Sequence, residues 1–554
     1  MPFDLRIEPW LPVRRKSRKV EIIAPFNLTD GLAGDPIVAL AAPRPDFQGA
    51  LLEFLIGLFS VALAAQEAED WEALGEAPPP PEALRAALMR LPPAFFLDGD
   101  GPRFLQDLTA SDFDDQAPIP IENLLIDAAG QITQERNKDL FVKRARVPAM
   151  GLSAAAMALI TLQTYAPSGG QGHRTSMRGG GPLTTLVEPR GDGRERDESG
   201  ERPLWELIHA NLQLASDAWA LPDDWTSPQD EGVAERVWPW LAPTIASSGD
   251  PPRQVSPVWP DAHPFQAFFG MPRRIRLEFD DEGGICALTG RHSPVLVRQY
   301  RTRNYGVHYG DGLWLHPLSP HYRNKTIWRP VHPQPDGLGW KDWAGLVTHG
   351  EDTRPAECVS RHKRRFDRPY AVRAFGYDMD NMKARSWAEA LLPVWPQATL
   401  GPGVADAMAE AARQMVEATR LAGNLLVGAV VAARFKADAK GDFSAIKAQL
   451  WAAMEQAFLT RLDAAAASKL AVSQAILAHN GGYAAALRRE TCAIFDSEID
   501  LDGFGFEDAE RLVRARRNLV SALNGYGKGG KALFAALGLP SPDPGRRKAR
   551  ERAA

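Results

Sequence analysis

The pattern of hydrophobic and polar positions is mixed up to about residue 395. Apolar residues at helical spacing predict helices over Phe47 to Gln66 and Leu152 to Thr164. Short apolar or β-branched runs bounded by turn residues predict strands over Leu183 to Val187, Arg274 to Phe279, Val295 to Tyr300 and Gly312 to Leu315. The last three of these strands are expected to form an antiparallel sheet. The sequence therefore predicts an α+β fold with antiparallel sheet elements for this part.

The pattern changes after Pro396, where alanine-rich stretches carry apolar residues at helical spacing. Four long amphipathic segments with short joins predict an antiparallel four-helix bundle: Val404 to Phe435, Phe443 to Ala465, Lys469 to Phe495 and Phe506 to Asn524. We therefore expect a mixed α/β domain over 1–395, the bundle over 396–540 and a disordered basic tail over 541–554. Residues 189–202 lack an apolar side chain to bury and are expected to be flexible.

Composition places this chain among ordinary globular proteins. It has 554 residues, of which 45% are hydrophobic and 24% charged, enough to bury sizeable cores in two or more domains. Cys286, Cys358 and Cys492 lie too far apart for a disulfide framework or a zinc site, so we expect no metal, no cofactor and a cytoplasmic location. We find no signal peptide and no apolar run of the ~18 residues that span a bilayer, so we expect no membrane association.

Positive charge is concentrated in two segments, although the net charge is −5. Between Arg136 and Arg178, seven basic residues face one acid, a net of +6, and between Arg361 and Arg373 six face one, a net of +5. The rest of the chain therefore carries −16. This asymmetry favours local binding of nucleic acid. The alternative is that both clusters are solvated faces.

Residues 165–186 form the most informative segment, with six glycines and two arginines between a predicted helix and a predicted strand. A loop containing Gly169, Gly170 and Gly172 can lay its backbone amides against another molecule, and Arg174 and Arg178 add charge beside it. Phosphate or a nucleic-acid groove suits this combination. A mobile surface loop is the alternative. The spacing matches neither a phosphate-binding P-loop nor a dinucleotide fingerprint.

This segment, from Ala166 to Thr185, resembles the glycine loop of the CasA family, the large subunit of the type I-E CRISPR surveillance complex Cascade. Further segments resemble that family in its own order up to about residue 390: Glu8 to Val13, Phe104 to Asp107, Pro120 to Leu124, Asn137 to Lys143, Leu313 to Pro320 and Gly376 to Lys383.

The resemblance implies a non-catalytic subunit that reads the protospacer-adjacent motif in double-stranded DNA from the minor groove and wedges the duplex open to start an R-loop. It assigns motif recognition to the glycine loop, through Gly169, Gly170, Gln171, Gly172, His173 and Arg174. Arg301 and Arg303 are candidates for a second basic element that reads the motif. It assigns the duplex wedge to Asp380, Asn381, Met382 and Lys383. Asn381 is a shorter amide than the glutamine that relatives can have.

The resemblance also implies that the segment Asn137 to Arg146 holds the 5′ handle of a guide RNA and anchors the subunit, through Asn137, Lys138, Phe141, Lys143, Arg144 and Arg146. The residue types agree, since an aromatic ring stacks on an unpaired base and cations neutralise phosphates. Alternatively, Phe141 and Val142 are core residues of a strand. Expected partners are the guide RNA, target DNA, the backbone and small subunits of Cascade, and a nuclease-helicase recruited after R-loop formation.

A self-sufficient metal-dependent nuclease is the alternative function. It would use His316, His321 and scattered carboxylates, but the intervening prolines make these histidines weak metal ligands. No nucleophile elbow or Walker signature supports an enzyme. Four arginines near the end of the predicted bundle could contact DNA or protein, with a solvated helix face as the alternative: Arg511, Arg514, Arg516 and Arg517.

Overall fold

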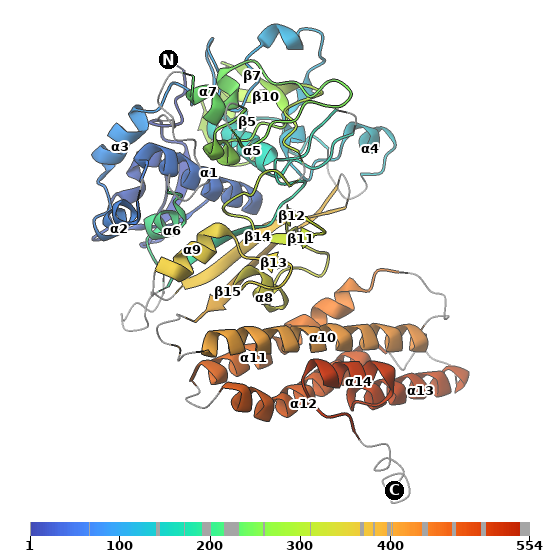
Figure 1. Ribbon diagram of the computed structural model, residues 1–554. Coiled ribbons are helices and arrows are strands. Elements are labelled where there is room, and N and C mark those ends of the chain that lie inside the picture. The colour runs from blue at the N-terminus through green and yellow to red at the C-terminus, as the bar shows by residue number, and fades with distance from the viewer. Residues whose placement is uncertain are drawn as a thin grey trace, which may run out of the picture. The chain divides into compact units, whose positions relative to one another are not determined.

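The computed structural model describes residues 2–65, 67–139, 144–170, 172–190, 201–214, 232–258, 261–310, 312–365, 370–380, 383–395, 400, 403–434, 441–467, 472–499 and 506–542. Two compact units make up the chain. The first consists of residues 1–334 and 351–391, and the second of residues 335–350 and 392–554. Figure 1 shows that the strands belong to the first unit and the long helices α10 to α14 to the second.

Small antiparallel sheets organise the first unit. The described sheets have the orders β2-β1-β3, β4-β10-β5 with β7 also paired to β10, β12-β11-β13, β15-β14-β6 and β8-β9. Every pair with a described register is antiparallel. The strands are β1 (Leu11–Arg15), β2 (Val20–Ile23), β3 (Ile37–Leu40), β4 (Ile119–Pro120), β5 (Met150–Gly151), β6 (Thr184–Pro189), β7 (Arg274–Asp280), β8 (Gly284–Ile285), β9 (His292–Ser293), β10 (Leu296–Arg303), β11 (His321–Asn324), β12 (Ile327–Pro330), β13 (Thr353–Arg354), β14 (Tyr370–Asp380) and β15 (Lys383–Val394).

Helix α1 (Pro45–Leu63) is the central helix of the first unit and packs against α5 (Leu152–Tyr165). Both are apolar nearly all round, as expected of helices buried on every side. The other α-helices of this unit are α2 (Ala68–Glu76), α3 (Pro81–Met89), α4 (Gln131–Glu135), α6 (Leu204–Asn211), α7 (Ala234–Val237) and α9 (Glu357–Arg365). Its 3-10 helices are η1 (Pro25–Thr29), η2 (Ala110–Phe113), η3 (Ile121–Leu124), η4 (Pro239–Leu241) and η5 (Pro264–Phe268).

One sequence expectation about membranes needs correction. Two described helices, Pro45–Leu63 and Val404–Arg434, are long and apolar enough by length and composition to cross a bilayer. In α1, 89% of the apolar window is buried inside the unit. A core helix passes the same test, so α1 fits its place in the core without a membrane.

The second unit is helical, as its alanine-rich periodicity predicts. It contains α10 (Val404–Arg434), α11 (Ser444–Ala467), α12 (Val472–Glu498), α13 (Phe506–Leu523) and α14 (Gly527–Ala536). Helix α14 packs on α10 and α13 through the buried Leu533 and Leu537 beyond its end. The sequence pattern did not predict α14, because three glycines in Gly527 to Gly530 disfavour a helix.

Residues 335–350 pack with the helical unit although the chain before and after them belongs to the first unit. They form η6 (Trp340–Asp342) and α8 (Trp343–Leu346). The Trp340 ring lies against Phe458 and Trp451, and its Nε1 donates to the Trp451 carbonyl at 2.8 Å. Buried aromatic rings with satisfied N–H groups hold this segment on α11.

The predicted strand at Gly312 to Leu315 is wrong. The described residues 312–315 form a turn and irregular backbone, and Gly312 has a φ of +73° that a strand does not adopt. The other predicted strands correspond to β6, β7 and β10. Most of the predicted flexible segment, 191–200, and of the predicted tail, 543–554, lies outside the described residues.

Candidate nucleic-acid interface

The glycine loop joins α5 to β6, and its glycines have two different surroundings. A Cβ at Gly169 would lie 2.6 Å from the Arg273 guanidinium, and one at Gly172 would lie 2.7 Å from the Asn304 side chain. Gly170 has a φ of +88°, and a Cβ there would meet nothing within 4 Å. Gly169 and Gly172 therefore allow close packing within the protein, whereas Gly170 presents exposed backbone to the outside.

Arg178 anchors the loop from inside and does not add charge to its surface, so that sequence expectation is wrong. Its side chain is buried and forms an ion pair with the buried Glu53 of α1. Arg178 also donates to the hydroxyl groups of Thr184 and Ser319, both at 3.0 Å. Tyr165 and Thr184 each donate to Glu53 at 2.7 Å. The network connects both ends of the loop to the core helix.

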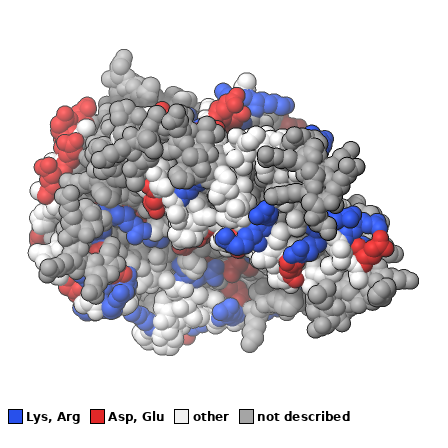
Figure 2. All heavy atoms as spheres, turned by 90° about the horizontal axis from the view of Figure 1, so that it is seen from below, with Lys and Arg blue, Asp and Glu red and all other residues white. Residues whose placement is uncertain are grey.

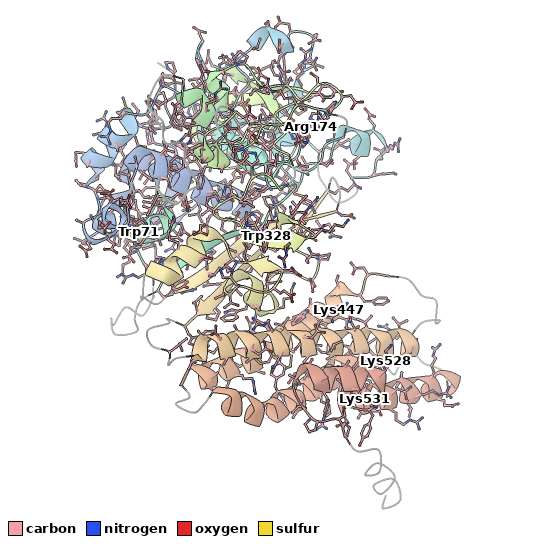
Figure 3. The ribbon with its side chains drawn as sticks, viewed as in Figure 1. Trp71, Arg174, Trp328, Lys447, Lys528 and Lys531 are labelled. Atoms are coloured by element: carbon pink, nitrogen blue, oxygen red, sulfur yellow. The ribbon has the colours of Figure 1, made fainter. Side chains whose placement is uncertain are left out.

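Arg174 is half-buried and is held by Ser247, with its Nε at 2.8 Å from the Ser247 hydroxyl and its Nη2 at 3.1 Å from the carbonyl (Figure 3). The Ser247 hydroxyl donates in turn to the Gly306 carbonyl at 2.7 Å. This places Arg174 at the side of the loop. Its Nη1 donates no hydrogen bond to a described residue, so this N–H group can bind an external phosphate.

His173 is neutral near physiological pH. Burial and the neighbouring Arg273 lower its pKa from 6.5 to about 4. The folded state therefore binds fewer protons than the unfolded state between these two values, and stability falls as the pH falls through that window. We expect wild type to lose thermal stability more steeply than His173→Gln between pH 7 and pH 4. Thermal unfolding midpoints measured from pH 7 to pH 4 check this expectation. An equal change of midpoint with pH in both proteins would contradict the burial of His173.

Arg273 is a residue that sequence reasoning missed. It lies just before β7, is 8% exposed, and donates to the Pro167 carbonyl at the start of the loop. Burial lowers its pKa from 12.5 to about 10, which leaves it charged. The only signal was an additional arginine before a predicted strand. Its position under Gly169 supports the loop and keeps a positive charge beneath the exposed backbone.

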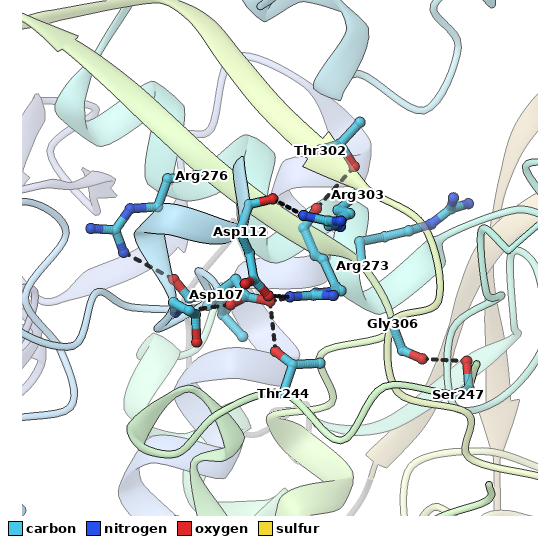
Figure 4. A network of polar contacts seen from close by, with 12 residues as sticks. Asp107, Asp112, Thr244, Ser247, Arg273, Arg276, Thr302, Arg303 and Gly306 are labelled. Atoms are coloured by element: carbon cyan, nitrogen blue, oxygen red, sulfur yellow. Dashed lines mark hydrogen bonds and ion pairs between the residues drawn. The ribbon is translucent and has the colours of Figure 1, made fainter. Parts of the chain in front are cut away.

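Arg301 and Arg303 lie on β10 and already have partners. Arg301 pairs with Glu278 at 2.5 Å and donates to the Gln116 carbonyl at 2.6 Å. Arg303 donates to the Asp112 carbonyl and lies 3.6 Å from the Asp115 carboxylate. Figure 4 shows the contact of Arg303 with Asp112 among the polar contacts around Asp107. Their assigned role in motif recognition stays a prediction, and direct contact with DNA requires them to exchange these partners.

The end of β10 meets the glycine loop directly. The Tyr305 amide donates to the Gly172 carbonyl at 2.7 Å, and the Ser247 amide donates to the Tyr305 carbonyl at 3.1 Å. Two elements that are about 130 residues apart in the sequence therefore form one surface.

The end of the β14–β15 hairpin that lies next to its turn is the third element at this surface. A Cβ at Gly181 would lie 2.7 Å from the Tyr377 carbonyl, so the loop and β14 are in close contact. At the predicted wedge, the structure describes Asp380 at the end of β14 and Lys383 at the start of β15, both exposed. Asn381 and Met382, like Gln171 of the loop, lie outside the described residues.

A cavity of about 220 Å³ opens between these elements. Asp378 in it is held by Arg385, whose Nε and Nη2 lie 2.8 and 2.7 Å from the carboxylate. The lining comes from the glycine loop, the segment after β12 and the turn end of the β14–β15 hairpin: Ser168, Thr175, Gly180, His332, Pro333, Gln334, Asp378, Met379 and Arg385. The cavity therefore connects the predicted motif-reading loop with the predicted wedge.

The described residues of the predicted RNA-binding segment, 137–139 and 144–146, belong to the first unit, where 137–139 follow α4 closely in the chain (Figure 1). Arg144 pairs with Asp139 at 2.6 Å and donates to the Asn137 side chain at 3.1 Å. Lys138 and Arg146 are exposed. Phe141 and Lys143 lie outside the described residues, so base stacking by Phe141 stays a prediction.

The second basic cluster, Arg361 to Arg373, is partly structural. Arg361 is buried and donates to the Leu212 carbonyl, and Arg373 pairs with Glu188. On the helical unit, Arg514 and Arg516 pair with Glu510 and Asp496. Figure 2 shows positive side chains beside negative ones on the face it presents.

The two histidines of the nuclease alternative are buried near the cation Arg178. His316 and His321 are 2% and 4% exposed, and burial lowers the pKa of His316 well below 6.5 and that of His321 to about 3. The His316 ring packs against Phe268. Among the described residues, no three His, Cys, Asp or Glu side chains form a group that could hold a metal ion.

The fold and this interface define an α+β protein with a helical C-terminal unit and an exposed glycine loop. The profile of the CRISPR-associated protein Cse1 family matches residues 4–491. The chain therefore belongs to the Cse1 (CasA) family, which confirms the resemblance to the large subunit of Cascade.

Individual relatives agree. The CasA/Cse1 protein of Thermus thermophilus is 29% identical over 173 residues, which cover 30% of this chain and 32% of that protein. The crystal structure of CasA from Thermus thermophilus is similar with a TM-score of 0.64 at 17% identity, covering 94% of this chain and 99% of that one. Thermobifida fusca Cse1 gives 0.67 at 16% identity, covering 97% and 98%. A chain of a CRISPR RNA-guided surveillance complex gives 0.65 at 16% identity, covering 94% and 99%.

Proposed function

We propose that this chain is the non-catalytic subunit of an RNA-guided DNA surveillance complex that reads a short motif in double-stranded DNA and starts strand separation. The observation that carries the proposal is that the glycine loop, with its exposed Gly170 backbone, contacts the end of β10 and shares a cavity with the β14–β15 hairpin, in a chain of the Cse1 family.

The glycine loop is the motif reader in this proposal. Bare backbone at Gly170 approaches the minor-groove edge, where a side chain would collide with sugars. Arg174 lies on the side where a phosphate would bind, and Arg273 adds positive charge from below. Because the minor groove distinguishes base pairs incompletely, we expect a permissive motif preference.

The tip of the β14–β15 hairpin is the wedge. Strand separation costs a few kcal/mol of free energy for each unstacked base step. Insertion of the hairpin tip and pairing of the DNA with the guide RNA offset this cost. We expect Asn381→Ala to retain motif-dependent duplex binding in the reconstituted complex but to open less of the duplex. Fluorescence of 2-aminopurine next to the motif measures the opening. If both Asn381→Ala and Lys383→Ala open the duplex as far as wild type, the assignment of the wedge to this hairpin tip is wrong.

The remaining roles follow from family membership and complete the proposal. The segment 137–146 holds the guide RNA, and the helical unit, as an antiparallel four-helix bundle of α10 to α13 with α14 added, contacts other subunits of the complex in the cytoplasm. A separate nuclease-helicase, recruited after R-loop formation, cuts the DNA. The burial of His316 and His321 near the cation Arg178 gives the nuclease alternative no support.

A further inference from the structure

The hairpin formed by β11 and β12 exposes apolar side chains on one face. Its register pairs Tyr322 with Arg329 and Asn324 with Ile327, so Tyr322 and Ile327 are diagonal neighbours on this face. Their exposed fractions are 38% and 44%. Leu313 is 44% exposed and follows Gly312, which packs against Ile327. The three apolar side chains therefore form an exposed row.

The opposite face of the same hairpin fixes two guanidinium groups on an indole ring. Trp328 has the Arg354 guanidinium 4.4 Å and the Arg323 guanidinium 5.8 Å from its ring centroid (Figure 3). Arg323 also pairs with Asp352 at 2.7 Å. Such cation–π contacts hold the cations at the hairpin in defined positions.

The hairpin and its neighbouring strand carry an excess of positive charge. Residues 321–330 and 351–354 contain four basic side chains, Arg323, Lys325, Arg329 and Arg354, against the acids Glu351 and Asp352. Lys325 occupies the exposed turn with a φ of +57° and makes no ion pair with a described residue. A cation at the turn beside an exposed apolar row is complementary to a partner with phosphates and unstacked bases.

The hairpin leads directly into the cavity beside the glycine loop. After β12, the Val331 carbonyl accepts from the Leu183 amide at 2.9 Å. The His332 ring is 3.1 Å from the Arg178 carbonyl, and His332 and Gln334 line the cavity. The hairpin and the cavity are therefore neighbours in the first unit.

We propose that the β11–β12 hairpin binds single-stranded nucleic acid, with bases against Tyr322 and Ile327 and phosphates against Lys325 at the turn. This inference rests on the proposed function for the source of the strand. A duplex does not suit the surface, because its base faces are stacked and unavailable to the apolar row. An acidic protein segment would pair with the positive charge of the hairpin but leave the exposed apolar row uncovered.

The test uses the full-length chain and a fluorescein-labelled oligodeoxythymidine in an anisotropy titration. We expect the double variant Tyr322→Ala/Lys325→Glu to weaken binding about tenfold or more, and Tyr322→Phe, which keeps the stacking ring, to bind like wild type. Lys528→Glu is the matched charge reversal, at an exposed lysine of α14, and is expected to bind within about twofold of wild type.

Two results would overturn the inference: equal binding by the double variant and wild type, or full competition by polyglutamate at equal charge, which would indicate an acidic protein partner. Failure of the proposed function is distinguishable. If Gly170→Asp leaves motif-dependent duplex binding intact, the motif-reading assignment fails, whatever the hairpin variants do. The double variant Tyr322→Ala/Lys325→Glu is expected to weaken single-strand binding while duplex motif discrimination remains.

Discussion

We expect Gly170→Asp to weaken motif-dependent duplex binding by the reconstituted complex and Gly170→Asn to retain most of it. Both residues tolerate positive φ, and the open space at Gly170 accommodates either side chain. They differ by one negative charge. The DNA phosphates repel the carboxylate of Asp, which costs several kcal/mol of binding free energy. Affinity for a motif-bearing duplex measures the difference, and we expect at least about a tenfold weaker Kd for Gly170→Asp than for Gly170→Asn.

This pair is a sharper test than substitution at Gly172. A side chain at Gly172 would collide with Asn304 and Tyr305, so its effect on DNA could arise from a displaced loop. Equal affinities of the two Gly170 variants, with both well folded, would mean that the exposed backbone of the loop does not face DNA.

Glu53→Ala is expected to destabilise the first unit severely. It removes the partner of the buried Arg178 and an acceptor of Tyr165 and Thr184. Leaving a buried charge without its partner costs about 3–5 kcal/mol, well above the typical effect of a substitution. Thermal unfolding of the full chain measures the loss.

The matched control is Asp280→Asn, which breaks the exposed pair with Arg298 at 2.7 Å on the same unit. Solvent screens that pair, so we expect its unfolding midpoint to stay essentially unchanged. A Glu53→Ala midpoint equal to that of Asp280→Asn would show that the Glu53–Arg178 network does not stabilise the unit. Glu53→Gln keeps one acceptor oxygen and is expected to fall between the two.

Local patterns were sufficient for the elements around the site. The helix before the glycine loop and the strand after it follow from apolar periodicity, and the structure has α5 and β6 there. The glycines themselves identified the loop, because few other residues take the positive φ of Gly170 and Gly172.

Long-range pairing could not be predicted from the sequence. Arg174 and Arg178 occupy the same loop and look equivalent, yet Arg178 is buried because Glu53, more than a hundred residues earlier, lies opposite it. Arg301 and Arg303 likewise find carbonyl and acidic partners from residues 112–116 and Glu278. Helix α14 forms despite its glycines because Leu533 is buried against neighbouring helices.

The most direct test of the central claim compares two duplexes that differ only in the motif beside the guide-matched sequence. Binding is measured for the guide-RNA-loaded complex assembled with and without this chain. Our account predicts that the complete complex prefers the motif-bearing duplex and that the complex lacking this chain binds both duplexes equally. Motif preference that persists without the chain would contradict the assignment of motif reading to it.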